Sequence, residues 1–296
     1  LGHAINPLTS LADERVYSIP MIVLVGQRGA PNIPDEPQHK KMGPQLINII
    51  KASKYKCFKI NASNFIKSIN EAVDYSKKNS CPVFLIVDKN FFLKNNKNKN
   101  KNNTKKNQIK RYDYINLLFE KKFVKNNTII GGTGFVSREL YFIATKFKKI
   151  KQCFFNIGAM GHANQIGLEV AINSKKKIII LDGDGAIQMH MGNLALLGKF
   201  KNEKILHIIF NNKVHESTGE QVVANSKINY KLILKGCGYA IVKNIYNLNQ
   251  FSNEIKKPIK KLTSLIIHVG PGSIDKLPRP KEDLGILKKI FQKKIL

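Results

Sequence analysis

Short apolar runs alternate along the chain with longer segments in which apolar residues recur at helical spacing. In the first part, residues 19–25 and 82–87 are apolar runs of strand length, whereas 42–53 and 62–78 show the helical spacing. A period near 3.6 indicates an amphipathic helix, and a short apolar run bounded by polar residues indicates a buried strand. The order strand, helix, helix, strand predicts a parallel sheet covered by helices.

The second part of the chain shows the same alternation with sharper boundaries. Helices are predicted at 112–123, 138–147, 163–173 and 186–200. Strands are predicted at 128–130, 178–181, 205–210 and 264–269. The predicted fold class is therefore α/β, with parallel sheets flanked by helices.

A stretch of almost pure lysine and asparagine separates the two parts. Residues 94–106 contain no apolar side chain and are too polar and too charged to pack into a core. We therefore predict a first domain at 1–93, a linker or surface insertion at 94–110, and a second domain at 111–296.

Glycine and polar residues follow the predicted strands of the second domain. Gly131-Gly132-Thr133-Gly134 follows the first strand, Gly183-Asp184-Gly185 the second, and Asn211-Asn212 the third. In open α/β sheets, ligands bind at the carboxyl ends of the strands. The residues expected to bind a ligand therefore lie at one edge of this sheet.

Gly183-Asp184-Gly185 has the features of a diphosphate site. Its glycines permit a tight turn and let a diphosphate approach backbone N–H groups, and the following helix presents its N-terminus to the anion. A strand, a crossover helix and a parallel strand would place Asp184 and Asn212 at neighbouring strand ends. There a carboxylate, an amide oxygen and a backbone carbonyl can hold Mg²⁺ against the diphosphate.

The composition narrows the classes of function. Lys and Arg number 50 against 20 Asp and Glu, for a formal charge of +30, and 43% of the residues are hydrophobic. Lysine is over-used together with asparagine almost everywhere outside the Gly-rich segments, so we interpret the charge as compositional drift and expect no nucleic-acid partner. A positive field would still attract an anionic substrate.

Other sequence features argue against zinc-binding, disulfide-stabilised, membrane and secreted proteins. These features are the cysteines, the histidines and the lengths of the apolar runs. The four cysteines form no C-x-x-C pair, and no zinc-ligand spacing is present. The longest apolar runs have strand length, so no membrane association is expected. Since the cysteines indicate no disulfide framework, a reducing cytoplasm is the expected location, and no signal peptide is visible. Because the chain begins at Leu1 and not at Met, we expect its natural N-terminus to lie upstream.

The spacing from Gly183-Asp184-Gly185 to Asn211-Asn212, between two predicted strands, resembles the cofactor motif of the thiamine diphosphate-dependent decarboxylase family. By that resemblance, the Mg²⁺ ligands would be Asp184, Asn212 and the main-chain oxygen of Val214. The domains would then be two thiamine diphosphate-binding-type domains, each with a parallel sheet flanked by helices.

Two more loops resemble those that hold the cofactor in this family. In 156–163, the Gly158 carbonyl would accept from the 4′-amino group, and Met160 would bend the cofactor into a V. Residues 133–140 resemble the first loop of the same domain. The cofactor-binding residues implied by the resemblance are Thr133, Gly134, Gly158, Met160, Gly161, His162, Gly183, Asp184, Gly185 and Asn212.

Further segments resemble the phosphonopyruvate and sulfopyruvate decarboxylases of that family. They are 6–13, 19–21, 26–29, 35–39, 181–186, 189–192, 211–221, 272–273 and 279–281. The resemblance implies that 1–93 is the later part of a pyrimidine-binding domain, incomplete at its N-terminus, and that 111–296 is a diphosphate-binding domain. It also implies a homodimer or larger homo-oligomer, because in this family the cofactor lies between domains of different subunits.

The reaction implied is decarboxylation of 3-phosphonopyruvate to phosphonoacetaldehyde and CO₂, with thiamine diphosphate and Mg²⁺. A small 2-oxo acid with a second anionic group needs several donors, which Gln38, Ser217 and Thr218 could supply. We expect His39 and His215 to bind the substrate or relay protons. The family activates its cofactor with a glutamate, and no Glu of this chain can be assigned that role. If the chain is complete as given, we expect weak cofactor binding and poor turnover.

Three alternative functions stay open, and two more are disfavoured. Sulfopyruvate decarboxylases and carboligases such as acetolactate synthase share parts of the motif, and the chain could also be an inactive cofactor-binding fragment. An RNA-binding protein is disfavoured because no recognition module is apparent. A serine hydrolase is disfavoured because Ser217 lacks the first glycine of G-x-S-x-G, a place that His215 occupies.

Overall fold

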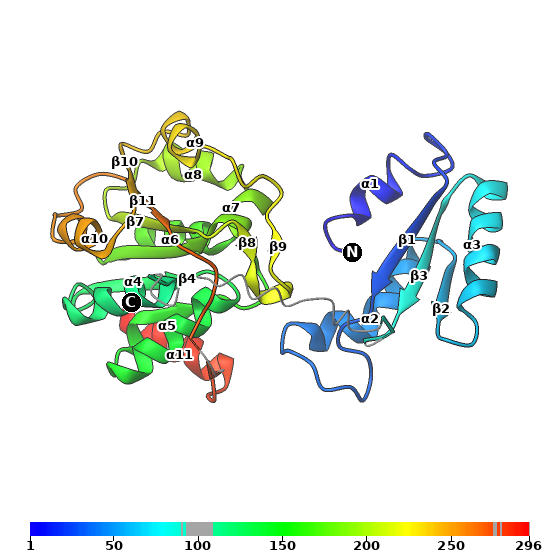
Figure 1. The fold of residues 1–296 in the computed structure, drawn as a ribbon, viewed down its shortest axis with the longest axis horizontal. Helices are drawn as coiled ribbons and strands as arrows, with labels where there is room; N and C mark the ends of the chain where they lie inside the picture. Colours follow the sequence, from blue (N-terminus) through cyan, green and yellow to red (C-terminus); the bar gives the residue numbers. More distant parts are fainter. Residues whose placement is uncertain (90, 93–108, 275–276, 279, 296) are drawn as a thin grey trace. The chain divides into compact units, whose positions relative to one another are not determined.

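The computed structural model describes residues 1–89, 91–92, 109–274, 277–278 and 280–295. The chain forms two compact units, Leu1–Asn100 and Lys101–Leu296 (Figure 1). The division between them falls inside the Lys/Asn-rich stretch. Most of the linker predicted at 94–110 lies outside the described residues, so the structure does not describe its conformation.

Unit 1 contains a parallel sheet with the strand order β1-β3-β2 among its described residues. Leu46 and Ile50 of one helix pack on one face of β3, and Ala72 of another packs on the opposite face. The elements are α1 (Ile5–Thr9), β1 (Met21–Gly26), α2 (His39–Ala52), β2 (Cys57–Ile60), α3 (Phe65–Asn79) and β3 (Pro82–Val87).

Strand β2 corrects the predicted order strand, helix, helix, strand. It pairs in parallel with β3 from Cys57 to Ile60 and lies between the two helices in sequence. Its four residues alternate Phe58 and Ile60 with Cys57 and Lys59, inside a lysine-rich segment. An alternation this short is visible only once β3 supplies its hydrogen-bonding partner.

Unit 2 is built on a sheet with the strand order β10-β11-β7-β6-β4-β5 among its described residues, and every neighbouring pair in it is parallel. The helices of this unit are α4 (Arg111–Glu120), α5 (Phe135–Lys146), η1 (Ile150–Gln152), α6 (Ala163–Asn173), α7 (Asp184–Met189), α8 (Asn193–Phe200), η2 (Glu216–Thr218), α9 (Tyr230–Gly236), α10 (Leu248–Ile255) and α11 (Leu284–Ile295). The strands are β4 (Asn127–Gly131), β5 (Cys153–Phe155), β6 (Lys177–Gly183), β7 (Ile205–Asn211), β8 (Val214–His215), β9 (Gln221–Val222), β10 (Ile241–Ile245) and β11 (Thr263–His268). The α/β prediction with parallel sheets is therefore confirmed.

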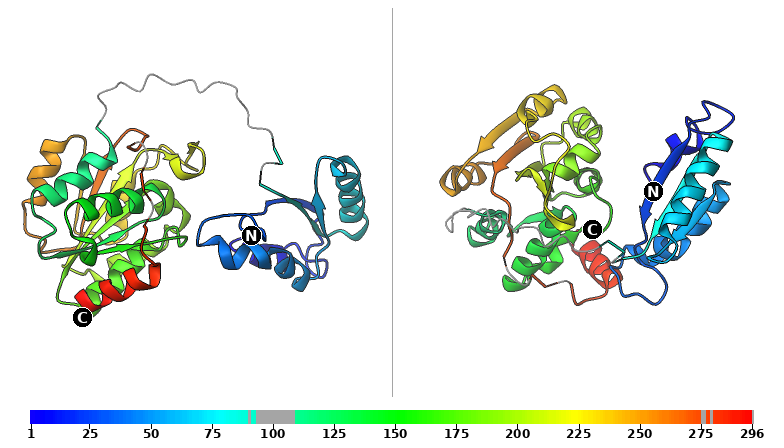
Figure 2. Two further views of the ribbon diagram at one scale, coloured as in Figure 1. Left: turned by 90° about the horizontal axis from the view of Figure 1, so that it is seen from below. Right: turned by 45° about the vertical axis from the view of Figure 1, so that its right-hand side comes forward.

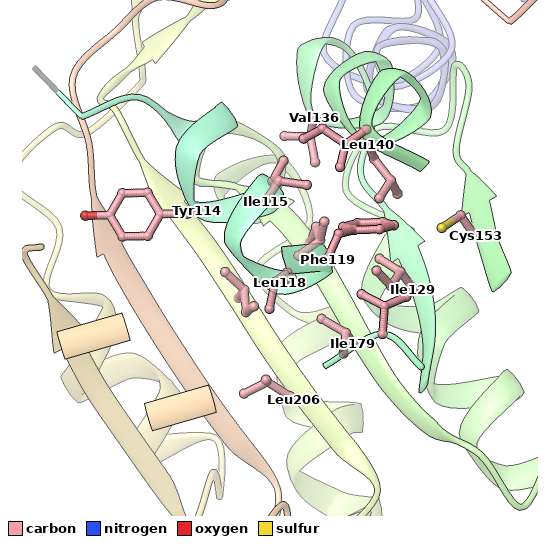
Figure 3. Close-up of a cluster of buried hydrophobic side chains, with 14 of the residues drawn as sticks. Tyr114, Ile115, Leu118, Phe119, Ile129, Val136, Leu140, Cys153, Ile179 and Leu206 are labelled. Carbon is pink, nitrogen blue, oxygen red and sulfur yellow. The ribbon is translucent and has the colours of Figure 1, made fainter. Parts of the chain in front are cut away.

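Helices cover both faces of this sheet (Figure 2), and the central strands are buried on both sides. Ile179 and Leu181 of β6 face a cluster with α4, α5 and α10, whereas Ile178 and Ile180 face a cluster with α6, α8 and α9. Figure 3 shows the first cluster, in which side chains of α4 and α5 lie over β4 and β6. Because both faces of these strands are buried, their sequences are continuous apolar runs without alternation of polar residues.

The helix predicted at 186–200 is in fact two helices, α7 and α8, with a break at His190. The rings of His190 and His162 lie 4.4 Å apart, and a Cβ on Gly161 would come within 2.6 Å of the His190 ring. The loop before α6 therefore packs on the residues between α7 and α8. Helical periodicity did not reveal this break, because its cause is a contact with a distant loop.

No helix in the described part of the chain combines the length and the apolar content that a bilayer crossing requires.

Candidate active site

The carboxyl ends of β6 and β7 lie side by side, because the two strands pair in parallel up to Gly183 and Phe210. Asp184 opens α7 directly after β6. One oxygen of its carboxylate accepts from the Gly185 N–H at 2.8 Å, and the other accepts from the Lys213 N–H at 2.6 Å. Asp184 is therefore hydrogen-bonded to the residue that directly follows Asn212, the residue that the motif spacing predicted to be its neighbour.

A pocket of about 490 Å³, open to solvent, lies at this edge of the sheet. The sequence-predicted residues that line it are Thr133, Met160, Gly183, Asp184, Gly185, Asn212, Val214 and His215. Four loops, which follow β4, β5, β6 and β7, thus meet at one cavity.

The other predicted residues of unit 2 lie in the same loops without lining the pocket. Gly134 has φ of 75°, and a Cβ on it would come within 3.1 Å of Ser217 Oγ. Gly158 and Gly161 have φ of 81° and 80°, a region that favours glycine. His162 Nδ1 lies 3.0 Å from the Met160 carbonyl oxygen, so it fixes the loop that carries Met160.

His39, the other histidine predicted to act on the substrate, lies in unit 1. It is the first residue of α2 and is partly buried. Arg28 forms two hydrogen bonds with Asp35, of 2.9 and 2.5 Å, and Asp35 also accepts from the Gly29 N–H at 2.6 Å. These bonds fix the loop that leads to His39. His39 and His215 belong to different units and are not brought together within either one.

Two buried side chains in the pocket carry oxygen atoms that could bind a metal ion. Asp184 is 2% exposed and Asn212 is 8% exposed. Burial raises the pKa of the Asp184 carboxyl above its usual value, and the N–H bonds from Lys213 and Gly185 oppose that shift. The Asn212 amide oxygen accepts from the Val214 N–H at 3.2 Å. A carboxylate and an amide oxygen in one pocket are the donor chemistry that Mg²⁺ or Ca²⁺ prefers.

The glycine turn leaves room for a ligand against the backbone. A Cβ built on Gly183 would meet no atom within 4 Å, although Gly183 lines the pocket. An anion could therefore reach the backbone there without displacing a side chain. Among the described residues, no group of three or more His, Cys, Asp and Glu side chains could hold a metal. A cation at this site would therefore need amide and backbone oxygens as well as Asp184.

Sequence analysis missed several residues of the pocket wall. They are Arg111, Phe135, Val136, Ala186, Phe210 and Glu216, whereas Ser217, which also lines the pocket, had been predicted as a donor. Phe135 and Val136 follow the predicted Gly loop, so their place could have been inferred from it. Arg111 comes from α4 and is 4% exposed, and nothing in its local sequence indicates that position.

Comparison with known proteins shows which protein family this chain resembles. Residues 141–269 match the family model described as "Thiamine pyrophosphate enzyme, C-terminal TPP binding domain". A phosphonopyruvate decarboxylase from Streptomyces viridochromogenes is 28% identical over 95% of this chain and 73% of its own length. The sulfopyruvate decarboxylase subunit beta of Methanocaldococcus jannaschii is 34% identical over 51% of this chain and 78% of its own length.

Among solved structures, a 2-oxoglutarate:ferredoxin oxidoreductase from Magnetococcus marinus aligns with 60% of this chain and 74% of its own chain, at 14% identity and a TM-score of 0.47.

The chain belongs to the thiamine pyrophosphate enzyme family, whose cofactor is also called thiamine diphosphate. Its relatives within that family are decarboxylases, so it is a thiamine diphosphate-dependent carboxy-lyase. The predicted family, enzyme class and organic cofactor are confirmed.

Replacing Gly185 by alanine tests how closely His215 packs on the glycine turn. The added Cβ would lie 2.4 Å from Cε1 and 2.6 Å from Nδ1 of His215, so the ring must move. We expect altered ring resonances of His215 in NMR spectra and a loss of about 1–3 kcal/mol in the free energy of unfolding. Gly183→Ala is the control, because its Cβ meets nothing and should leave the His215 resonances in place. Unchanged resonances in Gly185→Ala would contradict this packing.

Proposed function

We propose that this chain decarboxylates 3-phosphonopyruvate to phosphonoacetaldehyde and CO₂ with thiamine diphosphate and Mg²⁺. The observation that carries the proposal is the single pocket in which the Gly183-Asp184-Gly185 turn, Asn212 and Met160 meet. The similarity to a phosphonopyruvate decarboxylase along 95% of the chain supports the choice of substrate.

Mg²⁺ would bind between Asp184, Asn212 and the main-chain oxygen of Val214. All three residues line the pocket, and the two side chains are almost fully buried. A buried carboxylate without a cation is costly, and a divalent ion would offset that cost. The open backbone at Gly183 would take the diphosphate, next to the ion that balances its charge.

The remaining cofactor contacts would come from the loops at 133–134 and 156–163. Thr133 and Met160 line the pocket, with Met160 as the apolar support of the cofactor. The Gly158 carbonyl would hold a proton of the 4′-amino group, while Gly161 and His162 keep this loop against α7. Once bound, thiamine diphosphate supplies the electron sink that lets a 2-oxo acid lose CO₂.

The chain's own polar groups would bind the substrate. His215 and Ser217 line the pocket, and Thr218 follows on the same turn. These donors suit the second anionic group of the substrate, and His215 is placed to hold or pass a proton at its ring nitrogens. His39 and Gln38 of unit 1 would complete the donor set. No Glu of the chain is assigned the role of activating the cofactor.

Sulfopyruvate is the second candidate substrate. The sulfopyruvate decarboxylase subunit beta of M. jannaschii is 34% identical to part of this chain, a higher identity over a shorter stretch than the phosphonopyruvate enzyme shows. A sulfonate and a phosphonate have similar shapes but differ in charge, so the same donors could bind either one.

The proposal includes a homo-oligomer. The M. jannaschii relative is by name one subunit of an enzyme. Strand β1 stands at the edge of its sheet with Met21, Ile22 and Leu24 exposed by 38%, 38% and 54%. Apolar edge strands favour contacts with another chain. Sedimentation velocity should show a mass of at least two chains, and a single-chain mass at micromolar concentration would contradict the assembly.

Asp184→Asn tests the metal and diphosphate site. The amide keeps the shape of the side chain and removes its charge. We expect thiamine diphosphate binding in the presence of Mg²⁺, measured by isothermal titration calorimetry, to weaken by more than about 100-fold. Asp283→Asn is the matched control, because the Asp283 carboxylate accepts from N–H groups at the start of α11, outside the pocket. If Asp184→Asn still binds thiamine diphosphate in a Mg²⁺-dependent way, the proposed metal and diphosphate site is wrong.

A panel of 2-oxo acids tests the substrate. The chain, supplied with thiamine diphosphate and Mg²⁺, is given 3-phosphonopyruvate, sulfopyruvate and pyruvate, and the aldehyde released is quantified. We expect kcat/KM to be highest for 3-phosphonopyruvate and to exceed that for pyruvate by at least about 100-fold, since pyruvate lacks the second anionic group and leaves the donors unpaired. A higher kcat/KM for sulfopyruvate would show that sulfopyruvate, and not 3-phosphonopyruvate, is the substrate. If the chain binds the cofactor but turns over none of these acids, it would be an inactive cofactor-binding fragment.

A further inference from the structure

A buried network of charged side chains joins four distant segments of unit 2. Arg111, at the start of α4, donates from Nε and from one terminal nitrogen to the Glu139 carboxylate of α5, at 2.7 and 3.1 Å. Its other terminal nitrogen donates to Glu216 of η2 at 2.8 Å. Ser273 Oγ donates to Glu139 at 2.7 Å, and the Gly272 N–H donates to Glu216. The network thus ties the loop after β11 to η2 through two helices.

This network forms part of the pocket wall. Arg111 and Glu216 both line the pocket, beside Val214, His215 and Ser217. The side chains of Arg111, Glu139 and Glu216 are 5%, 0% and 6% exposed. Hydrogen bonds between charged groups at such depth are stronger than in water, and their geometry is correspondingly well defined.

The segment from Lys213 to Thr218 depends on contacts with other segments for its order. Its regular structure is limited to the two residues of β8 and the three of η2. The Lys213 N–H is bonded to Asp184, and Glu216 is bonded to Arg111 and Gly272. Val214 and His215 lie between these two anchors. Release of the Glu216 anchor would leave them held by the Lys213 bond and by pairing with the two exposed residues of β9.

Arg111 is already paired with two carboxylates, which balance its positive charge. Each of its three guanidinium nitrogens donates to Glu139 or Glu216. A lysine could not bridge two carboxylates in this way, because its ammonium lacks the planar fork. Only five of the 50 basic residues of the chain are arginines, which makes a buried one notable in so lysine-rich a protein.

We propose that Arg111, acting through Glu216, is a positioning residue that holds the segment from Val214 to Ser217 in its ligand-binding conformation before any ligand arrives. Its consequence for catalysis rests on the proposed function, in which Val214 and His215 face the metal and the substrate. Loss of the anchor lowers the fraction of molecules with this segment in place, and the apparent affinity falls by the same factor.

Glu216→Gln in the full chain tests this role, because the amide keeps the shape and removes the charge. In ligand-free protein, hydrogen–deuterium exchange at the amides of 213–218 and at Gly272 should accelerate by about tenfold, with exchange in the core of β6 and β7 unchanged. With ligands, the Kd for thiamine diphosphate in Mg²⁺ and the KM should each rise by about tenfold, while kcat at saturation stays within about twofold.

Glu254→Gln is the matched control, because Glu254 also accepts from two cationic side chains, Lys243 and Lys257, and does not line this pocket. It should change none of these quantities. Arg111→Lys should reproduce the effects of Glu216→Gln, and it provides the comparison if that variant does not fold.

Unchanged exchange at 213–218 in a folded Glu216→Gln or Arg111→Lys variant would overturn the positioning role. A uniform rise of exchange across unit 2, without a selective effect on this segment, would also overturn it and leave a purely structural ion pair. Failure of the unaltered chain to bind thiamine diphosphate would overturn only the proposed function, since the exchange comparison needs no ligand.

Discussion

The site depends on one buried carboxylate that joins two strand ends. Asp184 accepts from the first turn of its own helix and from the Lys213 N–H after β7. Because β6 and β7 are parallel neighbours, both attachments lie at the carboxyl edge of the sheet. Gly185 leaves room for the His215 ring, since a Cβ there would come within 2.4 Å of it. The course of the chain from Asn212 to His215, and with it the shape of the pocket, follows from this bridge.

The distribution of charge separates the surface of this protein from its interior. The chain carries a net charge of +30, yet the fully buried charged residues in the described part are Arg111, Glu139, Asp182 and Asp184. All four belong to unit 2, and three of them are acidic. Removing one partner of a buried ion pair costs about 3–5 kcal/mol, whereas an exposed lysine is nearly free to change. Drift toward lysine is therefore compatible with the fold as long as these few buried groups are kept.

Sequence patterns predicted the elements whose signal is local. The run at 205–210 is β7, and the helix predicted at 163–173 coincides with α6. The same patterns missed β2, whose four residues acquire a strand partner only in the sheet. They also merged α7 with α8, because the break between them comes from packing against the loop around Gly161. Each error has a contact between distant segments as its cause.

The sequence by itself determined the cofactor chemistry, because turn glycines, a carboxylate and an amide at strand ends are local features with a defined spacing. It predicted that Asp184 and Asn212 would be neighbours, since one crossover connection leaves little freedom in their placement. Only the tertiary structure decided that Arg111 and Glu216 belong to the same wall. They are 105 residues apart and are hydrogen-bonded directly, while Glu139 and the loop after β11 bind the same two side chains. No periodicity encodes such a meeting, because it results from the packing of α4 and α5 on the finished sheet.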